Sequence, residues 1–319
     1  MSKRVLIIGG AGAIGGNLVS KLLDECAEVL VVDNFSSGRL ANVDESALVS
    51  YCDIFDRDKI DDIIQKFNPN YIYNLAAHFA NQNSVDYPYE DIKTNIIGQI
   101  NVLESCKRLK SLKKYVYASS SCVYGHVEQM QENASIYPCE TPYAINKYAA
   151  ELYTKYYSEQ FGVPTASVRI FNTFGEGEKA GKYRNVIPNF IDKALKNENI
   201  TITGDGSETR DFTYVSDTVQ CLTLAAESEF KNGEVFNSGT GIETEIKYLA
   251  EMIIRMCNSE SKVVFKERRD WDGVKNRVSN IERTNKLLGY KPSVSLIKGL
   301  ENTINWYRVN KDEKSHNSI

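Results

Sequence analysis

A cluster of glycines directly after the first apolar segment constrains this chain more than any other feature. The sequence VLIIGGAGAIGGNLVSKLL (residues 5–23) can be read as Gly10-x-Gly12-x-x-Gly15 or as Gly9-x-x-Gly12-x-x-Gly15. Both spacings supply a tight turn from a strand into a helix, a backbone that can approach a pyrophosphate, and a helix N-terminus that points at that anion. A glycine turn alone is weak evidence, because a sharp strand-to-helix connection needs glycine anyway. Its position between an apolar run and a helical pattern favours a dinucleotide site.

The second apolar run, Val29–Asp33, ends on a carboxylate 18 residues after Gly15. In dinucleotide-binding folds an acidic residue near this distance accepts hydrogen bonds from the ribose hydroxyls. The same carboxylate repels a 2′-phosphate, so we expect NAD rather than NADP.

Three further polar residues are candidates near the cofactor. Asp53 ends the third apolar run and could approach the adenine, or it could cap the helix predicted from Arg57. Asn95 and Asn101 lie in a helical pattern, where asparagine is not favoured. Either could support the loops beneath the cofactor, or lie on the solvated surface.

Short apolar runs alternate with longer helical patterns through the first half of the chain. Six runs are predicted as strands, over residues 4–9, 29–33, 48–53, 71–77, 114–119 and 165–171. Longer segments between them are predicted as helices, over residues 12–26, 57–66, 89–109 and 143–161. Short apolar strands joined by helices indicate a parallel sheet covered on both faces. The predicted fold class is therefore α/β, a doubly wound parallel sheet of the Rossmann type, whose ligands bind at the carboxyl ends of the strands.

The pattern becomes irregular after Phe174, where glycine-rich turns occupy residues 175–181 and 204–212. This change predicts a smaller C-terminal lobe that is interleaved with the first domain. We expect an NAD-binding domain over residues 1–172 and a substrate-binding lobe mainly over 173–319, with about 205–235 returning to the first domain.

Composition excludes several classes of function. The 38 basic and 42 acidic residues give a net charge of −4 without a block of like charge, so we expect no nucleic-acid partner. No apolar stretch approaches the roughly 18 residues that suggest a membrane span. Seven scattered cysteines without a CxxC pair fit reduced thiols in the cytoplasm, and three well-separated histidines make a metal site unlikely.

Tyr143 and Lys147 lie four residues apart at the start of the helical segment YAINKYAAELY, so their side chains share one helix face. A nearby ammonium, together with a nicotinamide cation, would lower the pKa of the phenol and let Tyr143 act as a general base near neutral pH. Because the chain has 19 tyrosines, this spacing also arises by chance. The glycine turn, Asp33 and the serine cluster SSSC (residues 119–122) at the end of another strand strengthen the catalytic interpretation.

Together these features resemble the extended short-chain dehydrogenase/reductase family, and in particular its nucleotide-sugar epimerases and dehydratases. The matching segments run along nearly the whole chain: GGAGAIGG (9–16), VVDN (31–34), NLAA (74–77), NIIGQINVLE (95–104), SSSCVYG (119–125), PYAINKYAAE (142–151), VRIFNTFG (168–175), GDGSETRDFTYVSD (204–217) and LLGYKP (287–292).

The resemblance implies roles for three catalytic residues. Tyr143 would take a proton from a sugar hydroxyl, usually at C4, while Lys147 holds the nicotinamide ribose and Ser120 hydrogen-bonds the same sugar oxygen. It also implies an NAD site formed by Gly9, Gly12, Ala13, Ile14, Gly15, Asp33, Asn34, Asp53, Ile54, Leu75, Ala76, Ala77, Asn95, Ser119, Tyr143 and Lys147.

The two residues after Ser120 bear on the reaction that follows oxidation. In 4,6-dehydratases of this family they are typically an Asp–Glu pair, and decarboxylases tend to carry Glu at the second position. This chain has Ser121 and Cys122 there, so the resemblance favours C4 epimerisation of a nucleoside diphosphate hexose, preferably a UDP-sugar, through a transient 4-keto intermediate. The alternatives are a C3/C5-epimerase or an oxidoreductase. A non-catalytic NAD-binding sensor would be expected to lose Tyr143 and Lys147.

Cys122 itself has two interpretations. In GDP-mannose 3,5-epimerases a cysteine at the equivalent place acts as acid and base, which requires a nearby cation to lower the pKa of the thiol. Those enzymes carry a lysine two residues before a proline, and alignment on Pro188 puts Val186 at that position. We therefore favour the other interpretation, a small residue packed behind the loop.

The resemblance also implies a substrate with an anionic diphosphate. The candidate substrate-binding residues are His78, Ser84, Ser121, Cys122, Asn172, Arg210 and Arg269. The arginines would bind diphosphate oxygens through their forked donors, or form surface ion pairs instead. Arg268 and Arg277 are possible substitutes for Arg269, because the local sequence departs from the family pattern. His78 could contact a substrate hydroxyl or carboxylate, or simply belong to its loop.

Two expectations about partners complete the prediction. The nucleotide base would be read mainly by backbone groups around residues 185–190 and 200–202. Relatives pair through the helices that begin near Asn95 and Tyr143, so we expect a homodimer, with neither a nucleic acid nor a membrane as partner.

Overall fold

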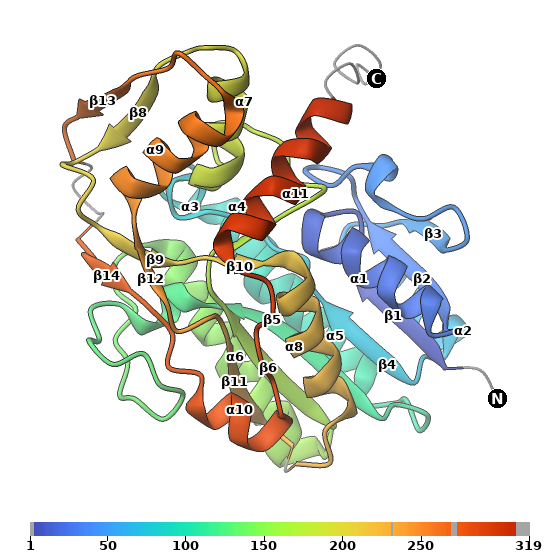
Figure 1. The fold of residues 1–319 in the computed structure, drawn as a ribbon. Helices are drawn as coiled ribbons and strands as arrows, with labels where there is room; N and C mark the ends of the chain where they lie inside the picture. Colours follow the sequence, from blue (N-terminus) through green and yellow to red (C-terminus); the bar gives the residue numbers. More distant parts are fainter. Residues whose placement is uncertain (1–2, 231, 269–272, 311–319) are drawn as a thin grey trace.

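The computed structural model describes residues 3–230, 232–268 and 273–310. Its centre is a seven-stranded sheet in the order β11-β6-β5-β4-β1-β2-β3 (Figure 1). The strands are β1 (Arg4–Ile8), β2 (Glu28–Asp33), β3 (Leu48–Tyr51), β4 (Tyr71–Asn74), β5 (Lys114–Ser120), β6 (Thr165–Ile170) and β11 (Glu234–Ser238). Every neighbouring pair in this sheet is parallel. The predicted doubly wound parallel sheet is confirmed.

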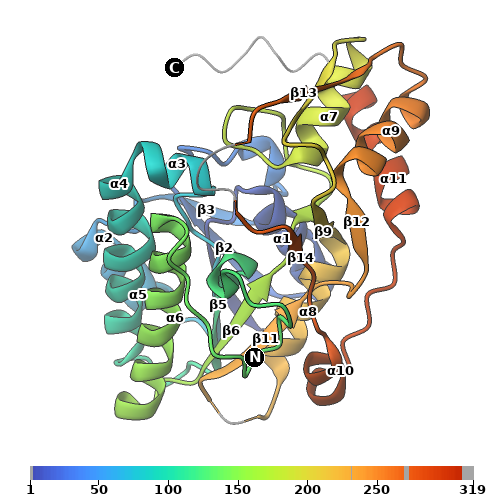
Figure 2. The same cartoon turned by 90° about the vertical axis from the view of Figure 1, so that its left-hand side faces the viewer.

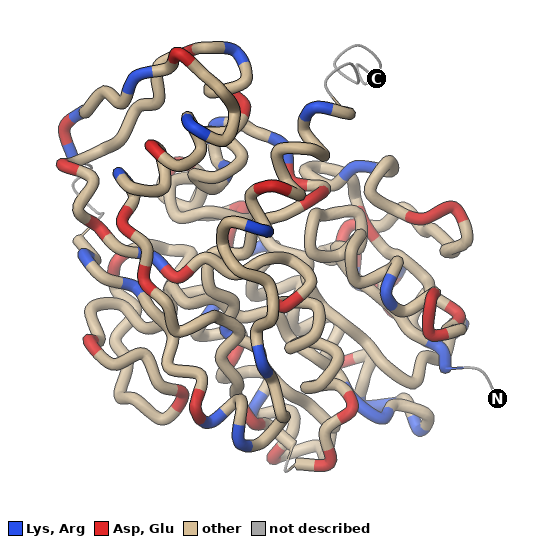
Figure 3. Tube along the Cα trace, in the orientation of Figure 1, with Lys and Arg blue, Asp and Glu red and all other residues tan. Residues whose placement is uncertain are grey.

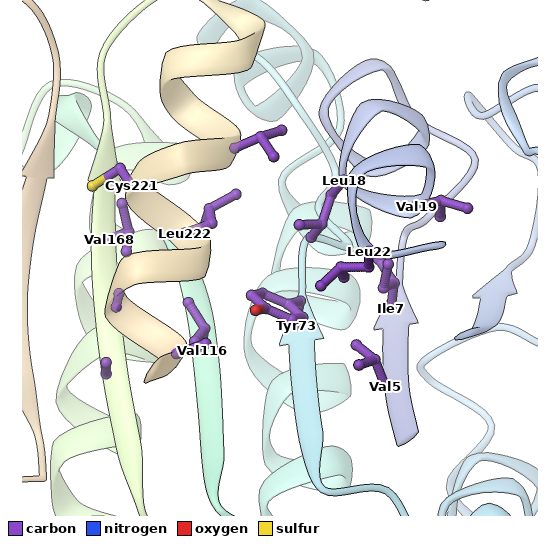
Figure 4. Close-up of a cluster of buried hydrophobic side chains, with 14 of the residues drawn as sticks. Val5, Ile7, Leu18, Val19, Leu22, Tyr73, Val116, Val168, Cys221 and Leu222 are labelled. Carbon is purple, nitrogen blue, oxygen red and sulfur yellow. The ribbon is translucent and has the colours of Figure 1, made fainter. Parts of the chain in front are cut away.

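Alternating side chains of the strands fill two apolar layers, one on each face of the sheet. Val5 and Ile7 of β1 belong to one layer, and Leu6 and Ile8 belong to the other. The first layer is covered by α1 (Ala13–Asp24), α8 (Val215–Glu227) and α10 (Glu282–Leu288), and the second by α2 (Arg57–Phe67), α5 (Gln99–Cys106) and α6 (Pro142–Phe161). In Figure 4, Leu22 of α1 lies against β1 in the first layer. Full burial of such a side chain contributes roughly 1.5–3 kcal/mol, so these layers hold the helices on the sheet.

Two elements differ from the sequence-based prediction. The seventh strand, β11, comes from the irregular second half of the chain and pairs with β6. The helix predicted over residues 89–109 is three consecutive segments: α4 (Pro88–Ile92), the π-helical turn η2 (Lys93–Gly98) and α5. π-Helical turns inside helices often occur at functional sites, and this one carries Asn95.

The second lobe has its own apolar core between helices and short strands. Its helices are α7 (Val186–Leu195), α9 (Ile246–Cys257) and α11 (Leu296–Val309), which pack together with residues such as Ile200 and Leu300. Three small sheets accompany them: β7 (Thr173–Phe174) with β10 (Thr213–Tyr214), β8 (Ile200–Thr203) with β13 (Val263–Lys266), and β12 (Glu243–Glu245) with β9 (Thr209–Asp211) and β14 (Asn276–Arg277). The remaining short elements are η1 (Leu40–Asn42), α3 (Asn81–Asp86) and η3 (Ser121–Tyr124).

Different helices lie on two opposite flanks of the molecule. In Figure 2, α4, α5 and α6 stand side by side on one flank, and α9 and α11 lie on the opposite flank. Acidic and basic residues are interspersed along both lobes (Figure 3). Within the described ranges, none of the helices has the length and apolar character needed to cross a membrane, and no group of three His, Cys, Asp or Glu residues could hold a metal ion.

Candidate active site

A cleft of about 1140 Å³ lies between the carboxyl ends of the central strands and the second lobe. It is placed at the point where the strand order reverses, because the chain leaves the neighbouring strands β1 and β4 toward opposite edges of the sheet. Its walls include most of the residues predicted from the sequence: Gly9, Gly12, Ala13, Ile14, Gly15, Asp33, Asn34, Ile54, Leu75, Ala76, Ala77, His78, Ser119, Ser120, Ser121, Cys122, Tyr143, Lys147, Asn172 and Arg210.

The glycine turn after β1 has the shape of a phosphate cradle. A Cβ on Gly15 would come within 2.5 Å of the Gly9 carbonyl oxygen, and a Cβ on Gly9, at φ +78°, would meet Ala76 N at 2.6 Å. Gly12 has more room, since the nearest atom to its Cβ would lie at 3.4 Å. As the N-cap of α1, Gly12 supplies no side-chain cap, so the first N–H groups of the helix remain available at the cleft. This geometry fits the pyrophosphate of NAD.

Asp33 is buried at the end of β2 and faces the same cleft. Its Oδ2 accepts a hydrogen bond from Ala11 N at 2.9 Å, and its Oδ1 accepts one from Phe35 N at 2.8 Å. These bonds fix the carboxylate beside the glycine turn. Each carboxylate oxygen has further accepting capacity, so Asp33 can also accept from the hydroxyls of a ribose.

Replacing Asp33 with asparagine is expected to weaken NAD binding by at least about tenfold and to improve the ratio of NADP to NAD affinity, because one charge-assisted acceptor and the repulsion of a 2′-phosphate are both lost. Titration of the apoprotein with each cofactor measures both affinities. The control is Asp44→Asn, which changes an exposed carboxylate that bonds only locally, to Ser46 N. Unchanged NAD affinity in Asp33→Asn would show that this carboxylate does not contact the cofactor.

Asp53 and Asn95, two predicted cofactor contacts, lie beside the cleft and not in its wall. The Oδ2 of Asp53 accepts from Asn34 Nδ2 at 2.9 Å, and the cap of α2 is Asp56 instead. Asn95 is buried and exchanges hydrogen bonds with the backbone of His78, at 3.2 and 3.3 Å. The buried Asn95 therefore supports the His78 loop from behind, whereas the exposed Asp53 holds the side chain of Asn34.

Ser84 was predicted to bind the substrate, but it is fully buried and does not line the cleft. Its hydroxyl donates to Asn81 O at 2.7 Å and accepts from Tyr143 N at 3.0 Å. It therefore holds the first turn of α6. Asn101 has a similar supporting role, since its Nδ2 donates to the carbonyls of Ile54 and Phe55.

The ends of α6 and β5 bring together the three predicted catalytic residues. Thr141 caps α6 by accepting from Ala144 N at 3.3 Å, and this places Tyr143 in the first turn with Lys147 one turn later. Ser120 is the last residue of β5, and its Oγ accepts from Cys122 N at 3.2 Å. All three catalytic candidates are buried and line the cleft.

Burial controls the protonation of Tyr143 and Lys147. It raises the pKa of Tyr143 well above its ordinary value, electrostatic interactions with Cys122 and Asp91 act in the same direction, and the hydrogen bond with Ser120 opposes both. Burial lowers the pKa of Lys147 to about 7, against the attraction of nearby carboxylates. The residues of the protein do not by themselves give Tyr143 the lowered pKa expected from the sequence. A cation bound in the cleft has to supply that effect.

A buried ion pair fixes the end of β5 beneath the site. Arg169 of β6 donates to both carboxylate oxygens of Glu151, at 2.6 and 3.1 Å. Ser119 Oγ donates to the same carboxylate at 2.9 Å. Because breaking a buried pair leaves an uncompensated charge that costs about 3–5 kcal/mol, this contact is a strong restraint on the serine cluster.

Two further predicted residues, an arginine and an asparagine, also lie at the cleft. Arg210 of β9 lines the cleft, and its Nη1 donates to the carbonyls of Thr209 and Lys275. Asn172 also lines the cleft, with Nδ2 donating to Asp211 O at 3.1 Å. Arg269 lies outside the described residues, and Arg268 forms an ion pair with Glu208.

Several residues of the site were not identified from the sequence. Glu178 lines the cleft, where burial raises its pKa to about 7. Asp91 is fully buried, and its Oδ1 accepts from Asn146 Nδ2 at 2.6 Å. Arg184 spans the two lobes by donating to Ser37 O at 3.0 Å. Nothing in the local sequence separates these groups from surface charges, because their role depends on segments far away in the chain.

Comparison with known proteins agrees with this geometry. The chain matches the model of the NAD dependent epimerase/dehydratase family over residues 5–239. It is 34% identical to the putative UDP-glucose 4-epimerase of Methanocaldococcus jannaschii, over 96% of this chain and 99% of that protein. It is also 34% identical to the UDP-N-acetyl-alpha-D-glucosaminuronate decarboxylase of Bacillus cytotoxicus, over 97% of this chain and 98% of that protein.

A solved structure gives the same fold. The UDP-glucose 4-epimerase of Thermotoga maritima, crystallised with UDP-glucose, aligns with a TM-score of 0.92 and 31% identity, over 97% of this chain and 100% of that one. The similarity therefore includes both lobes and the cleft between them.

Proposed function

Because the chain belongs to the NAD-dependent epimerase/dehydratase family, we propose that it inverts the configuration at C4 of a UDP-linked sugar. That it is an NAD-dependent enzyme acting on sugar nucleotides follows from the family itself. The observation that carries the finer assignment is the cluster of Tyr143, Lys147 and Ser120 in one cleft, next to a loop whose residues 121 and 122 are not acidic.

In the proposed reaction the chain's own residues bind, orient and move one proton. NAD, when bound at the glycine turn and Asp33, would supply the hydride acceptor and donor. Tyr143 takes the proton of the sugar C4 hydroxyl as the hydride leaves, and Ser120 holds the same oxygen. Lys147 orients the cofactor ribose. The 4-keto sugar then turns over in the cleft, and Tyr143 returns the proton as the hydride comes back on the other face.

The side chains of the serine loop argue against elimination or decarboxylation. Removal of water needs an acid and a base beside the sugar ring, and in this chain Ser121 and Cys122 occupy the positions where the family resemblance would imply carboxylic acids for such steps. Glu151 accepts from Ser119 but is paired with Arg169, and Glu140 is paired with Arg277.

One observation supports C3/C5 epimerisation as the second candidate. Such a reaction needs a cation next to Cys122. Val186 cannot supply one, but Arg277 Nη1 donates to Cys122 Sγ at 3.1 Å. Arg277 is therefore positioned as the neighbouring cation that an acid–base role of Cys122 would need.

The test is incubation of the holoprotein with UDP-glucose, UDP-N-acetylglucosamine, UDP-glucuronic acid and UDP-N-acetylglucosaminuronic acid, followed by NMR of the products in deuterated water. C4 epimers without net NADH and without solvent deuterium in the ring support the proposal. Deuterium at C3 or C5 would favour the second candidate, and a pentose product would assign decarboxylation.

We also propose that the protein is a homodimer that pairs through α6 and the helices beside it. Ile145, Leu152 and Tyr156 lie on one face of α6 and are 46%, 49% and 50% exposed. The adjacent η2 adds Ile97, which is 40% exposed. Continuous apolar surface of this kind on two neighbouring helices is typical of an interface.

The double substitution Ile97→Glu with Leu152→Glu is expected to convert a dimer into a monomer in sedimentation velocity at micromolar concentration, because two charges per subunit would be buried at the interface. Ile242→Glu, at a 69% exposed residue of the second lobe, should leave the dimer intact. A wild-type protein that sediments as a monomer would refute the proposed pairing.

A further inference from the structure

The loop that follows β4 brings a histidine and a buried carboxylate together at the cleft. His78 lies in this loop and lines the cleft, and Asp91 of α4 is fully buried. The Nδ1 atom of His78 lies 3.6 Å from Oδ2 of Asp91, which is an ion-pair distance. Among the residues that the structure describes, neither of these two buried atoms has a hydrogen-bond partner. A buried carboxylate oxygen without a partner costs free energy, and a proton on the facing ring nitrogen reduces that cost.

Both members of the His78–Asp91 pair are held in place by other elements. Asn95 of η2 exchanges hydrogen bonds with the backbone of His78, and Asn146 of α6 donates to Oδ1 of Asp91 at 2.6 Å. Ala80 in the same loop has φ +87°, a strained conformation for a residue with a Cβ, and such strain is concentrated at functional sites. Because Nδ1 is turned toward Asp91, the opposite edge of the ring, which carries Nε2, is the edge turned to the cleft.

The pair lies close to the proposed base. Phe79, the residue after His78, packs edge-on against the ring of Tyr143, with 6.3 Å between the ring centroids. Burial is the main cause of the raised pKa of Tyr143, and electrostatic interactions with Cys122 and Asp91 add to it. A proton held by the pair cancels the charge of Asp91, so this part of the opposition to a phenolate disappears.

We propose that the His78–Asp91 pair takes up one proton when Tyr143 loses its own. The inference rests on the proposed function, because that function makes Tyr143 the base. One O–H bond breaks at the Tyr143 oxygen and one N–H bond forms at Nε2 of His78, so a phenolate and an imidazolium replace two neutral groups. The total charge of the site is unchanged, which avoids the cost of an uncompensated buried charge. His78 and Asp91 are thus positioning residues, since they act through Tyr143.

Two other titratable groups interact with the carboxylate of the pair. The charge of Asp91 acts on Tyr117 and on Lys147. Burial raises the pKa of Tyr117 well above its ordinary value, so Tyr117 stays protonated and takes no part. Burial lowers the pKa of Lys147 to about 7, so Lys147 is the alternative acceptor of the proton. Glu151 also acts on both groups, but it is paired with Arg169.

The test follows the phenolate of Tyr143 in the NAD-loaded protein by its ultraviolet absorbance as the pH is raised, with Tyr143→Phe as the blank. In His78→Gln the charge of Asp91 stays uncompensated. We therefore expect the midpoint of phenolate formation to rise by at least about 1 pH unit relative to the wild type. The double substitution His78→Gln with Asp91→Asn leaves neither charge, and we expect it to return the midpoint close to that of the wild type.

The variants separate this coupling from structural support of the loop. An unchanged midpoint in His78→Gln overturns the inference and leaves Lys147 as the acceptor. A midpoint that stays raised in the double variant overturns it as well, because the loss of His78 then acts through the structure. His126→Gln is the matched control, since His126 Nε2 lies 3.5 Å from Glu140 Oε1 but does not line the cleft, and it should leave the midpoint unchanged. Retained NAD and an unchanged circular dichroism spectrum show that each variant is folded.

This measurement needs no sugar, so it is independent of the proposed reaction. A substrate panel that yields no C4 epimer would overturn the proposed function, while the shift of the midpoint in His78→Gln would still support the pair. Epimerisation at C4 together with an unchanged midpoint in His78→Gln would overturn the pair and leave the proposed function standing.

Discussion

Replacing Tyr143 with phenylalanine is expected to lower kcat by about 10³-fold or more while the protein keeps its NAD. The substitution removes one oxygen atom from a buried ring that packs against Cys122 and Ala144, so the fold loses little packing. What it removes is the group that takes the proton from the sugar hydroxyl. General acid–base groups of this kind contribute typically 10²–10⁴-fold to the rate.

The measurement is steady-state turnover of the sugar identified by the substrate panel, with NAD content measured on the same sample. Tyr153→Phe is the matched control, because Tyr153 lies on the same helix and is 39% exposed to solvent. If Tyr143→Phe turns over the sugar as fast as the wild type does, Tyr143 is not the base.

Replacing Gly15 with alanine is expected to lower the free energy of unfolding by about 3 kcal/mol, and occasionally such overpacking costs more. The new Cβ would lie 2.5 Å from Gly9 O and 2.6 Å from Gly10 Cα. These are backbone atoms, which cannot rotate away as a flexible side chain can. The strand-to-helix turn would therefore have to open, and the phosphate cradle would open with it.

Gly12→Ala is the matched control within the same turn. Its Cβ would meet only Gly9 O, at 3.4 Å, which is an ordinary contact. We expect it to leave the unfolding midpoint of the apoprotein unchanged while it weakens NAD binding, because the methyl group lies at the N-terminus of α1 where the pyrophosphate approaches. Denaturant titration of both apoproteins checks this difference. Equal stability of the two variants would show that the tight turn at Gly15 is not required.

The fold could be predicted because its signals are local. Each of the first six strands is a short apolar run, and the glycine turn, Asp33 and the Tyr143–Lys147 spacing lie within segments of a few residues. β11 was not predicted from the sequence, because its five residues, EVFNS, lie among loops and have the composition of a loop. The break in the helix over residues 89–109 was not predicted either, since a π-helical turn leaves no distinct pattern of apolar residues.

The site was less predictable wherever a contact joins distant segments. Arg277 and Cys122 are 155 positions apart, so neither residue indicates the other in the sequence. Ser84 was expected near the substrate because of its motif, but the backbone of Tyr143 uses its hydroxyl. The pKa of Tyr143 illustrates the same limit, because burial by residues from several elements outweighs the effect expected from the helix spacing alone.

The most direct test of C4 epimerisation is to follow a deuterium label at C4 of the UDP-sugar that the protein turns over, in ordinary water, by NMR and mass spectrometry. Because the hydride taken from C4 returns to the same carbon, we expect a product inverted at C4 that keeps the label, with the protein-bound NAD oxidised at the end. A product that has lost the label to solvent, that keeps the original C4 configuration, or that lacks a carbon would contradict this account.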